Sequence, residues 1–299
     1  MKQKVPKTYG FVFSGGGARG LFAVQILKRL RDTDFDFSQV KAISGVSVGS
    51  IIGAMLAQGD LDKLIEMFEN ITNKDIYKGK ISLKRILWQR ITGKNYVLDI
   101  EPLHDLLWKY IDLEKAQKSK KVFEIGLVDM TTGQFRTFNQ FAFNSNEQYI
   151  RAIMASCSQP VIWKPQYFET RFEVIKSGSD GGVVTVSPIK SVLNADPDHV
   201  IIINSSPVVT ERVPQLKTME SVLMRTIDLA VGKGFQKDME TFVKYNEIGL
   251  SNKKAFKHYP ATIYQTDLHD DSLDFDSVKL KSDRVRNANI IFAKTPLIK

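Results

Sequence analysis

Cysteine and histidine are scarce, since the 299-residue chain has one cysteine and four histidines. A lone cysteine excludes a disulfide framework. One cysteine with four histidines also makes a cysteine-rich zinc module untenable. No His-x-x-x-His pair or carboxylate cluster stands on a plausible face, so we expect no metal. No apolar run approaches the ~20 residues that a transmembrane helix needs. The basic N-terminus makes a poor secretory signal because glycines soon interrupt the apolar run behind it, which favours a cytoplasmic protein.

Acidic residues are outnumbered, with 33 Asp and Glu against 42 Lys and Arg, which gives a net charge of +9 at pH 7. Such a charge favours anionic partners, either a membrane surface or a nucleic acid. No zinc-finger, RNP-type or helix-turn-helix pattern supports a nucleic-acid partner, so none is expected. Hydrophobic residues make up 43% of the chain, which is enough for a substantial core and excludes disorder as a description of the whole chain.

The order of apolar segments predicts a single α/β domain over residues 1–299, because no repeat or convincing linker divides the chain. Residues 9–13 and 40–44 are short apolar runs typical of buried strands, and they alternate with helical periodicity over 18–30 and 48–56. This order indicates a right-handed βαβ unit on a parallel sheet. Further along we expect a helical, cap-like insertion over 61–120, a hairpin of 122–129 and 134–138, a helix over 147–156, strands over 167–177, 199–204 and 261–265, a helix over 219–247, and a C-terminal helical extension over 210–299.

A glycine-rich loop at residues 15–20 lies between the first predicted strand and the first predicted helix. Its sequence, Gly-Gly-Gly-Ala-Arg-Gly, satisfies the dinucleotide fingerprint G-x-G-x-x-G. That fingerprint also needs a carboxylate at the end of the second strand, where this chain has Ile43-Ser44-Gly45. We therefore expect the free N–H groups of the loop to attract an oxyanion rather than a nucleotide.

A second motif, Gly45-Val46-Ser47-Val48-Gly49, is G-x-S-x-G between a predicted strand and a predicted helix. This is the context of a nucleophile elbow, in which small flanking residues allow a strained turn that presents the serine hydroxyl. We predict that Ser47 is a nucleophile, although a simple turn with a capping serine also fits the pattern. Because both strands end at the same sheet edge, the N–H groups of Gly16 and Gly17 should face the oxygen that develops beside Ser47.

A third motif, Asp180-Gly181-Gly182, places a carboxylate in a glycine turn at a strand end. Alone it is a common hairpin turn, but together with the other two motifs it makes Asp180 a usable general base. Arg19 in the first motif has three interpretations: it holds the glycine loop by hydrogen bonds, it adds positive charge, or it is a solvated surface arginine.

In their order and spacing, the three motifs resemble the patatin-like phospholipase family, whose members combine G-G-G-x-R-G, G-x-S-x-G and D-G-G/A. Residues 155–160, Ala-Ser-Cys-Ser-Gln-Pro, resemble the family's A-S-x-A-x-P segment, and residues 98–103 resemble a helix entry after the elbow. The resemblance covers about residues 8–205 and is thin beyond 210. Ser50 stands where a second glycine is common, and residues 183–188 lack the usual asparagines before proline, departures that bear on substrate preference.

The resemblance implies a three-layer α/β/α sandwich with a mainly parallel central sheet, and a Ser-Asp dyad that needs neither histidine nor cofactor. Ser47 would attack fatty-acyl esters of (phospho)glycerolipids while Asp180 takes its proton. The implied oxyanion-hole donors are the N–H groups of Gly15, Gly16, Gly17 and Ala18, and the implied supporting residues are Arg19, Gly45, Gly49, Gly181 and Gly182. Some similar bacterial proteins are activated by a partner protein or a signalling nucleotide, and no residue in this sequence decides that point.

Two alternatives stay open. The first is a Ser-His-Asp hydrolase of the ordinary α/β type, because three histidines follow Asp180 in the order that such triads use: His199, His258 and His269. The second is a non-catalytic lipid-binding scaffold, against which the intact Ser47 and Asp180 argue. His104 is expected on a helix face, and Cys157 is expected as a small buried hydrophobe.

The segment from Lys74 to Lys94 carries seven basic residues against one acidic residue. From residue 82, helical spacing aligns Leu83, Ile86, Leu87 and Ile91 on one face, with Trp88 at its border. A basic face, an apolar face and a tryptophan describe an interfacial helix. The competing interpretation is a cap helix whose apolar stripe faces the core. We expect peripheral association with an anionic membrane that holds the glycerolipid substrate.

Overall fold

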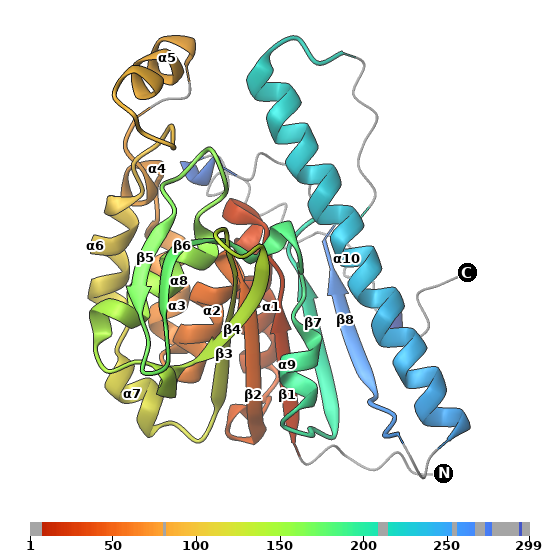
Figure 1. Ribbon diagram of the computed structural model, residues 1–299. Coiled ribbons are helices and arrows are strands. Elements are labelled where there is room, and N and C mark those ends of the chain that lie inside the picture. The colour runs from red at the N-terminus through yellow and green to blue at the C-terminus, as the bar shows by residue number, and fades with distance from the viewer. Residues whose placement is uncertain are drawn as a thin grey trace.

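The computed structural model describes residues 8–79, 82–208, 215–252, 256–266, 273–276 and 293–294. Within these ranges the strands form one sheet in the order β5-β6-β3-β2-β1-β7-β8-β9, and β4 pairs with β3 off this path (Figure 1). The strands are β1 (Tyr9–Phe13), β2 (Val40–Val46), β3 (Val122–Asp129), β4 (Gln134–Asn139), β5 (Gln166–Glu169), β6 (Val174–Asp180), β7 (His199–Asn204), β8 (Ala261–Gln265) and β9 (Ala293–Lys294). The α-helices are α1 (Leu21–Asp32), α2 (Val48–Ala57), α3 (Leu61–Asn70), α4 (Asn73–Ile76), α5 (Leu83–Ile91), α6 (Glu101–Tyr110), α7 (Leu113–Lys118), α8 (Asn146–Cys157), α9 (Ile189–Leu193) and α10 (Met219–Ser251), and short 3-10 turns include η1 (Gly17–Gly20) and η4 (Gly181–Val183).

The centre of the sheet, β3-β2-β1-β7-β8, is parallel and covered by helices on both faces. Successive side chains of a strand point to opposite faces, so the two faces build separate cores. Phe11 and Phe13 of β1 join the core that contains α1, α2 and α8, whereas Val12 joins the core that contains α9 and α10. The sheet is the middle of three layers, which confirms the predicted α/β/α fold with a mainly parallel sheet.

The βαβ unit predicted at the start of the chain is confirmed, since β1 and β2 pair in parallel across α1. The single strand predicted over 167–177 is wrong, because β5 and β6 form an antiparallel hairpin there. Its turn is closed by the N–H of Thr170, which donates to the carbonyl of Glu173 at 2.9 Å, and by the Thr170 hydroxyl, which accepts from the N–H of Phe172 at 3.2 Å. A threonine turn of this kind contains no glycine or proline that would mark it in the sequence.

The regions outside the sheet centre follow the predicted outline with some differences. Residues 61–120 contain the helices α3 to α7. Helix α10 ends at Ser251 rather than at residue 247. The strand predicted over 261–265 is confirmed as β8, which lies parallel to β7, so the described part of the C-terminal region adds strands to the sheet as well as a helix. In the described ranges, no helix combines the length and the apolar composition that crossing a membrane requires.

The register of the sheet brings three strand ends to one edge. Val46, the last residue of β2, pairs with Gly126 of β3. The next residue of β3, Leu127, pairs with Asp180 at the end of β6. β1 ends next to β2, with Phe13 opposite Gly45. The segments that follow β1 and β2 therefore meet the end of β6, although they are far apart in the chain.

The turn after β2 has no room for side chains at two of its glycines. A Cβ added to Gly45 would lie 2.1 Å from the carbonyl oxygen of Gly49. A Cβ added to Gly49 would lie 2.5 Å from the carbonyl oxygen of Phe13. Backbone atoms cannot move aside as the end of a flexible side chain can, so the close approach of β1, β2 and α2 requires glycine at both positions.

Replacing Gly45 by alanine should lower the free energy of unfolding by about 3 kcal/mol or more, because the new methyl group overlaps backbone. Gly133→Ala is the matched control: its φ is +70° and no atom lies within 4 Å of the added Cβ. That variant should lose only about 1 kcal/mol, the cost of left-handed backbone in a non-glycine residue. Denaturant unfolding of both variants measures the difference, and equal losses would contradict the steric explanation.

Candidate active site

Ser47 lies in a sharp turn between β2 and α2, with φ 56° and ψ −132°. A non-glycine residue with such backbone angles is strained, and it persists only where its surroundings hold it. Its N–H donates to the Ser156 hydroxyl at 2.9 Å, and that hydroxyl donates to the carbonyl of Gly126 at 2.6 Å. The Ser50 hydroxyl donates to the Ser47 carbonyl at 2.6 Å. The predicted elbow geometry is therefore present, and side chains from α8 and α2 fix it.

Asp180 ends β6 and its side chain is only 5% exposed. Its Oδ1 accepts the N–H of Gly182 at 2.8 Å, and its own N–H donates to the carbonyl of Ser158 at 2.9 Å. Burial raises the pKa of the Asp180 carboxyl to about 6, against the lowering effect of the Gly182 N–H and of the Ser47 hydroxyl. Ser47 and Asp180, predicted from separate motifs, thus meet at the edge where the register of the sheet places them.

The glycine loop follows β1 and lies against Ser47. A Cβ added to Gly15 would come 3.1 Å from the Cβ of Ser47, and one added to Gly16 would come 2.8 Å from the carbonyl oxygen of Ser205. Gly17 begins the 3-10 turn η1 with φ +55°. Among the described residues, no acceptor pairs with the N–H groups of Gly15, Gly16, Gly17 or Ala18. These donors are available at the turn beside the serine hydroxyl.

Arg19 is buried, with 3% exposure, which excludes the interpretation as a solvated surface arginine. Its Nε donates to the carbonyl of Gly16 at 3.3 Å. Its guanidinium also forms an ion pair of 2.8 Å with Asp228 on α10. Arg19 therefore ties the glycine loop to a helix that lies on the other side of the sheet from α1 and α2. Asp228 was not singled out from the sequence, because nothing local marks a carboxylate on a long helix as a partner for Arg19.

The end of β7 supports the same loop, and the sequence did not indicate this. The Ser14 hydroxyl donates to the Asn204 side-chain oxygen at 2.8 Å and accepts the N–H of Ser205 at 2.9 Å. The Ser206 hydroxyl donates to the carbonyl of Gly15 at 3.2 Å. The available signal was the polar Asn-Ser-Ser that directly follows the apolar run of β7 at the carboxyl edge of the sheet. All four polar side chains are buried: Ser14, Asn204, Ser205 and Ser206.

The described histidines lie away from Asp180. His199 begins β7, at the opposite edge of the sheet, where its Nε2 lies 2.8 Å from the Thr262 hydroxyl and burial lowers its pKa. His258 precedes the parallel strand β8 and so lies at that same edge. His104, on α6, pairs with Glu147 at the start of α8. His269 lies outside the described residues. The structure thus places no described histidine where a Ser-His-Asp triad needs one.

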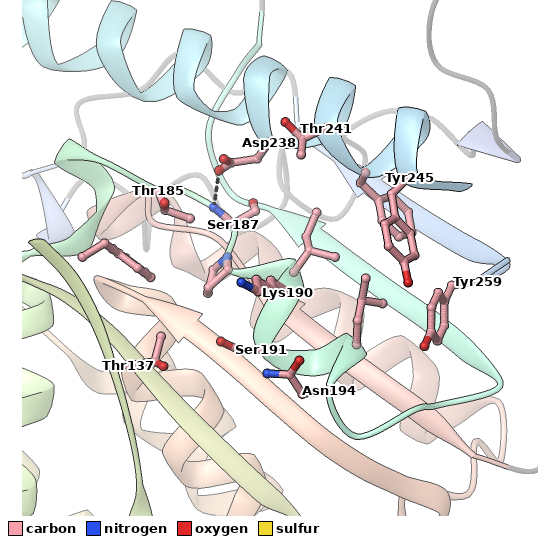
Figure 2. A pocket seen from close by; sticks show the side chains of 15 residues that line it. Thr137, Thr185, Ser187, Lys190, Ser191, Asn194, Asp238, Thr241, Tyr245 and Tyr259 are labelled. Atoms are coloured by element: carbon pink, nitrogen blue, oxygen red, sulfur yellow. Dashed lines mark hydrogen bonds between the residues drawn. The ribbon is translucent and has the colours of Figure 1, made fainter. Parts of the chain in front are cut away.

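Of two hollows in the described structure, one is lined by Ser47 and the other is not. A small apolar space of about 30 Å³ is lined by Gly17, Ser47 and hydrophobic side chains of α2, α3, α4, α6 and α8. A larger groove of about 730 Å³ lies between β4, α9 and α10 and contains neither Ser47 nor Asp180 (Figure 2). Asp238 in that groove accepts the N–H groups of Val186 and Ser187, both at 2.9 Å. Of these two hollows, the apolar space is the one that Ser47 lines.

Cys157 is buried, as predicted, and it lines the apolar space beside Ser47. Within the described ranges, no three His, Cys, Asp or Glu side chains gather as metal ligands would. The polar groups at the edge are instead hydroxyls, backbone N–H groups, the Asp180 carboxylate, and Arg19 with its partner Asp228. Such a set suits proton transfer and oxyanion binding.

Helix α5 does not direct its described apolar residues into the core. Leu87, Trp88 and Ile91 are 59%, 64% and 78% exposed. Figure 1 shows their helix, α5, standing above the body of the molecule. This excludes the interpretation of α5 as a cap helix whose apolar stripe packs inward. Lys84 and Arg90 are also exposed, whereas the half-buried Arg85 donates from its Nε to the carbonyl of Val97.

Replacing Asp180 by asparagine should stabilise the fold above pH 6. Below pH about 4 both the folded and the unfolded protein hold the Asp180 proton, and between about 4 and 6 only the folded protein holds it. The stability of the wild-type protein therefore falls as pH rises through this window and is level above it. Asp180→Asn does not undergo that loss. Its free energy of unfolding should therefore exceed that of the wild-type protein by a margin that grows to roughly 3 kcal/mol at pH 8. Denaturant unfolding at pH 4 and pH 8 tests this, and an equal difference at both would refute burial as the cause.

Comparison with known proteins gives a family. The model of patatin-like phospholipases matches residues 11–193. An uncharacterized protein of Acanthamoeba polyphaga mimivirus is 38% identical over 160 residues, 52% of this chain, and the chain spans about half of that relative, 53%. Among solved structures, VipD from Legionella pneumophila matches with a TM-score of 0.43 and 11% identity over 94% of this chain and 66% of VipD. The type III effector protein ExoU matches with a TM-score of 0.33 and 13% identity over 94% of this chain and 62% of ExoU. Because the family model covers more than half of its length, the chain belongs to the patatin-like phospholipase family.

Proposed function

We propose that the protein is a serine lipid acyl hydrolase that cleaves fatty-acyl esters of glycerolipids with Ser47 and Asp180. The observation that carries the proposal is the meeting of a strained serine and a buried carboxylate beside a glycine loop whose N–H groups at residues 15–18 have no acceptor in the described part of the chain. Membership in the family supports lipid hydrolysis as the general activity. The dyad, the donors and the choice of glycerolipid are the parts that experiments must test.

The proposed reaction has two steps that share one oxyanion site. In the first, the Ser47 hydroxyl attacks the acyl carbonyl while the Asp180 carboxylate accepts its proton. The negative oxygen that develops is stabilised by the N–H groups of Gly15, Gly16, Gly17 and Ala18. Asp180 then returns the proton to the departing alcohol, which leaves an acyl-enzyme. In the second step Asp180 takes a proton from water, the water attacks the acyl carbonyl, and collapse releases the fatty acid and restores the Ser47 hydroxyl.

Asp180 has the properties that a general base requires without a histidine. A carboxylate at the usual pKa accepts a proton weakly, whereas one raised to about 6 is still ionised at neutral pH and is a stronger base. Its Oδ1 accepts the N–H of Gly182, which fixes the direction of the carboxylate. Arg19, Gly45, Gly49, Gly181 and Gly182 act in the proposal by holding the loop, the elbow and the aspartate turn in place.

The apolar space beside Ser47 supports an acyl chain as the part of the substrate that enters the protein. Its walls are aliphatic and aromatic side chains, including Ile51, Phe68 and Leu107. Apolar walls stabilise methylene groups that leave water and offer nothing to a charged headgroup. The headgroup would then remain at the mouth of the site, which is the orientation expected of an enzyme that takes its substrate from a membrane.

Ser47→Ala and Asp180→Asn should each lower kcat/KM for a glycerolipid or a short-chain ester by at least ~10²–10⁴-fold, the range of a general-base contribution. For the wild-type protein, kcat/KM should rise tenfold per pH unit below pH 6 and become level above it, because only ionised Asp180 accepts the proton. Mass spectrometry of products from a lipid panel identifies the ester that is cut. Alanine at His199, His258 or His269 is the control, and loss of activity in one of these folded variants would favour the triad alternative.

We also propose that α5 docks the protein on an anionic membrane surface. Leu87, Trp88 and Ile91 form an exposed apolar group, and exposed Lys84 and Arg90 accompany them. Apolar side chains enter the headgroup region while basic ones attract anionic lipids, the combination typical of interfacial helices. Helix α10 starts at the same end of the molecule (Figure 1), and its exposed Met219 and Val222 add apolar surface there.

A charge variant and an apolar variant of this segment test the docking proposal. Lys84→Gln, Arg90→Gln and Lys94→Gln together should weaken binding to anionic vesicles at least about tenfold and reduce its salt dependence. Leu87→Ser, Trp88→Ser and Ile91→Ser together should weaken binding to anionic and zwitterionic vesicles alike. The control, Ile248→Ser with Leu250→Ser, removes exposed apolar residues from the other end of α10. Vesicle co-sedimentation reports binding, and unchanged sedimentation of both α5 variants would overturn the proposal.

A further inference from the structure

The apolar space beside Ser47 is completed by a residue from near the C-terminal end of the chain. Phe275 lines it together with Ser47, and its side chain is only 6% exposed. The neighbouring Leu273 is 7% exposed and belongs to the same hydrophobic core. Figure 1 shows this short blue segment beside α4. None of the sequence motifs includes residues 273–276.

The segment is held against α4 mainly by the side chain and backbone of Asn73. The Asn73 side-chain oxygen accepts the N–H of Phe275 at 2.8 Å, and its Nδ2 donates to Asp276 at 3.0 Å and to Asp274 at 3.3 Å. The Asn73 N–H donates to the Asp276 carboxylate at 3.1 Å. The Tyr77 hydroxyl donates to the carbonyl of Leu273 at 3.3 Å. These bonds are specific to the backbone and carboxylates of the segment, so they fix where Phe275 enters the apolar space.

The free volume that remains is too small for a fatty-acyl chain. It amounts to about 30 Å³, which holds roughly two or three water molecules at about 10–15 Å³ each. Removing a large buried side chain from such surroundings opens an apolar cavity on the order of 100 Å³, which stays dry and takes up apolar molecules. Phe275 thus occupies space that several methylene groups would otherwise fill.

We propose that Phe275 sets the length of the acyl chain that the site accepts, with the Asn73 contacts holding it in that position. The inference rests on the proposed function and names its acyl-chain preference. A short acyl group beside Ser47 needs less new space than a long one, so it requires less movement of the Phe275 ring. A longer chain requires the ring to move, so it loses part of the binding free energy that its methylene groups would contribute. Phe275 is therefore a specificity-determining residue rather than part of the reacting group.

The test compares kcat/KM for a series of soluble p-nitrophenyl esters from four to twelve acyl carbons. Phe275→Ala should raise the ratio of the twelve-carbon to the four-carbon value at least about tenfold over wild type, since a pocket discriminates by such factors for small changes in apolar fit. Asn73→Ala should change the ratio in the same direction without altering a wall of the space. The matched control is Phe256→Ala, because Phe256 is 42% exposed and packs edge-on against Tyr245.

A binding measurement separates this inference from the proposed chemistry. Fluorescent dodecanoic acid should bind Ser47→Ala with Phe275→Ala at least about tenfold more tightly than Ser47→Ala alone. Unchanged ester ratios and unchanged fatty-acid binding in folded Phe275→Ala and Asn73→Ala variants would overturn the role of Phe275, while Ser47-dependent hydrolysis would still stand. Absence of Ser47-dependent hydrolysis of every ester would instead overturn the proposed function, and the binding measurement would then decide whether Phe275 limits access to the space. Thermal unfolding establishes that each variant is folded.

Discussion

The strained turn at Ser47 is the constraint on which the rest of the site depends. Its backbone is held with φ at 56° because Gly45 and Gly49 allow β2, α2 and the end of β1 to approach more closely than any side chain would permit. Ser156 accepts the Ser47 N–H, and the Ser156 hydroxyl is anchored in turn on Gly126 of β3. The position of the serine is therefore set by the backbones of neighbouring strands and by a side chain of α8, and none of the described histidines takes part.

Polar groups whose burial lowers the stability of the fold lie together at the same edge of the sheet. Burial raises the pKa of Asp180, so keeping this carboxylate ionised at neutral pH opposes folding. The glycine loop is held by three other residues. Ser206 donates to the carbonyl of Gly15, and Asn204 accepts from the hydroxyl of Ser14 just before the loop. Arg19 bonds the carbonyl of Gly16 and forms an ion pair with Asp228. Because Asp228 belongs to α10, the helix that begins at the same end of the molecule as α5 is bonded directly to the loop beside Ser47. The candidate site and the proposed docking surface thus share one structural element, α10.

The sequence predicted the features that residues close together in the chain specify. The βαβ start and the turn at Ser47 are specified by apolar runs and glycines within a few residues, and both are present. The support from Ser156, Asn204 and Asp228 was not predicted, because these contacts join residues that only the folded sheet brings together. The hairpin of β5 and β6 was missed since a threonine closes its turn. Phe275 escaped notice for a similar reason: an isolated phenylalanine among aspartates gives no indication that it lies near Ser47 in the fold.

The central claim is that Ser47 is a nucleophile activated by Asp180, and covalent labelling tests it most directly. A fluorophosphonate probe reacts with activated serines and remains attached, so peptide mass spectrometry locates the modified residue. The account predicts one labelled peptide that contains the Ser47 elbow, with labelling abolished in Ser47→Ala and slowed strongly in Asp180→Asn. Labelling at a different serine, or no labelling of folded wild-type protein under conditions that label a known serine hydrolase, would contradict it.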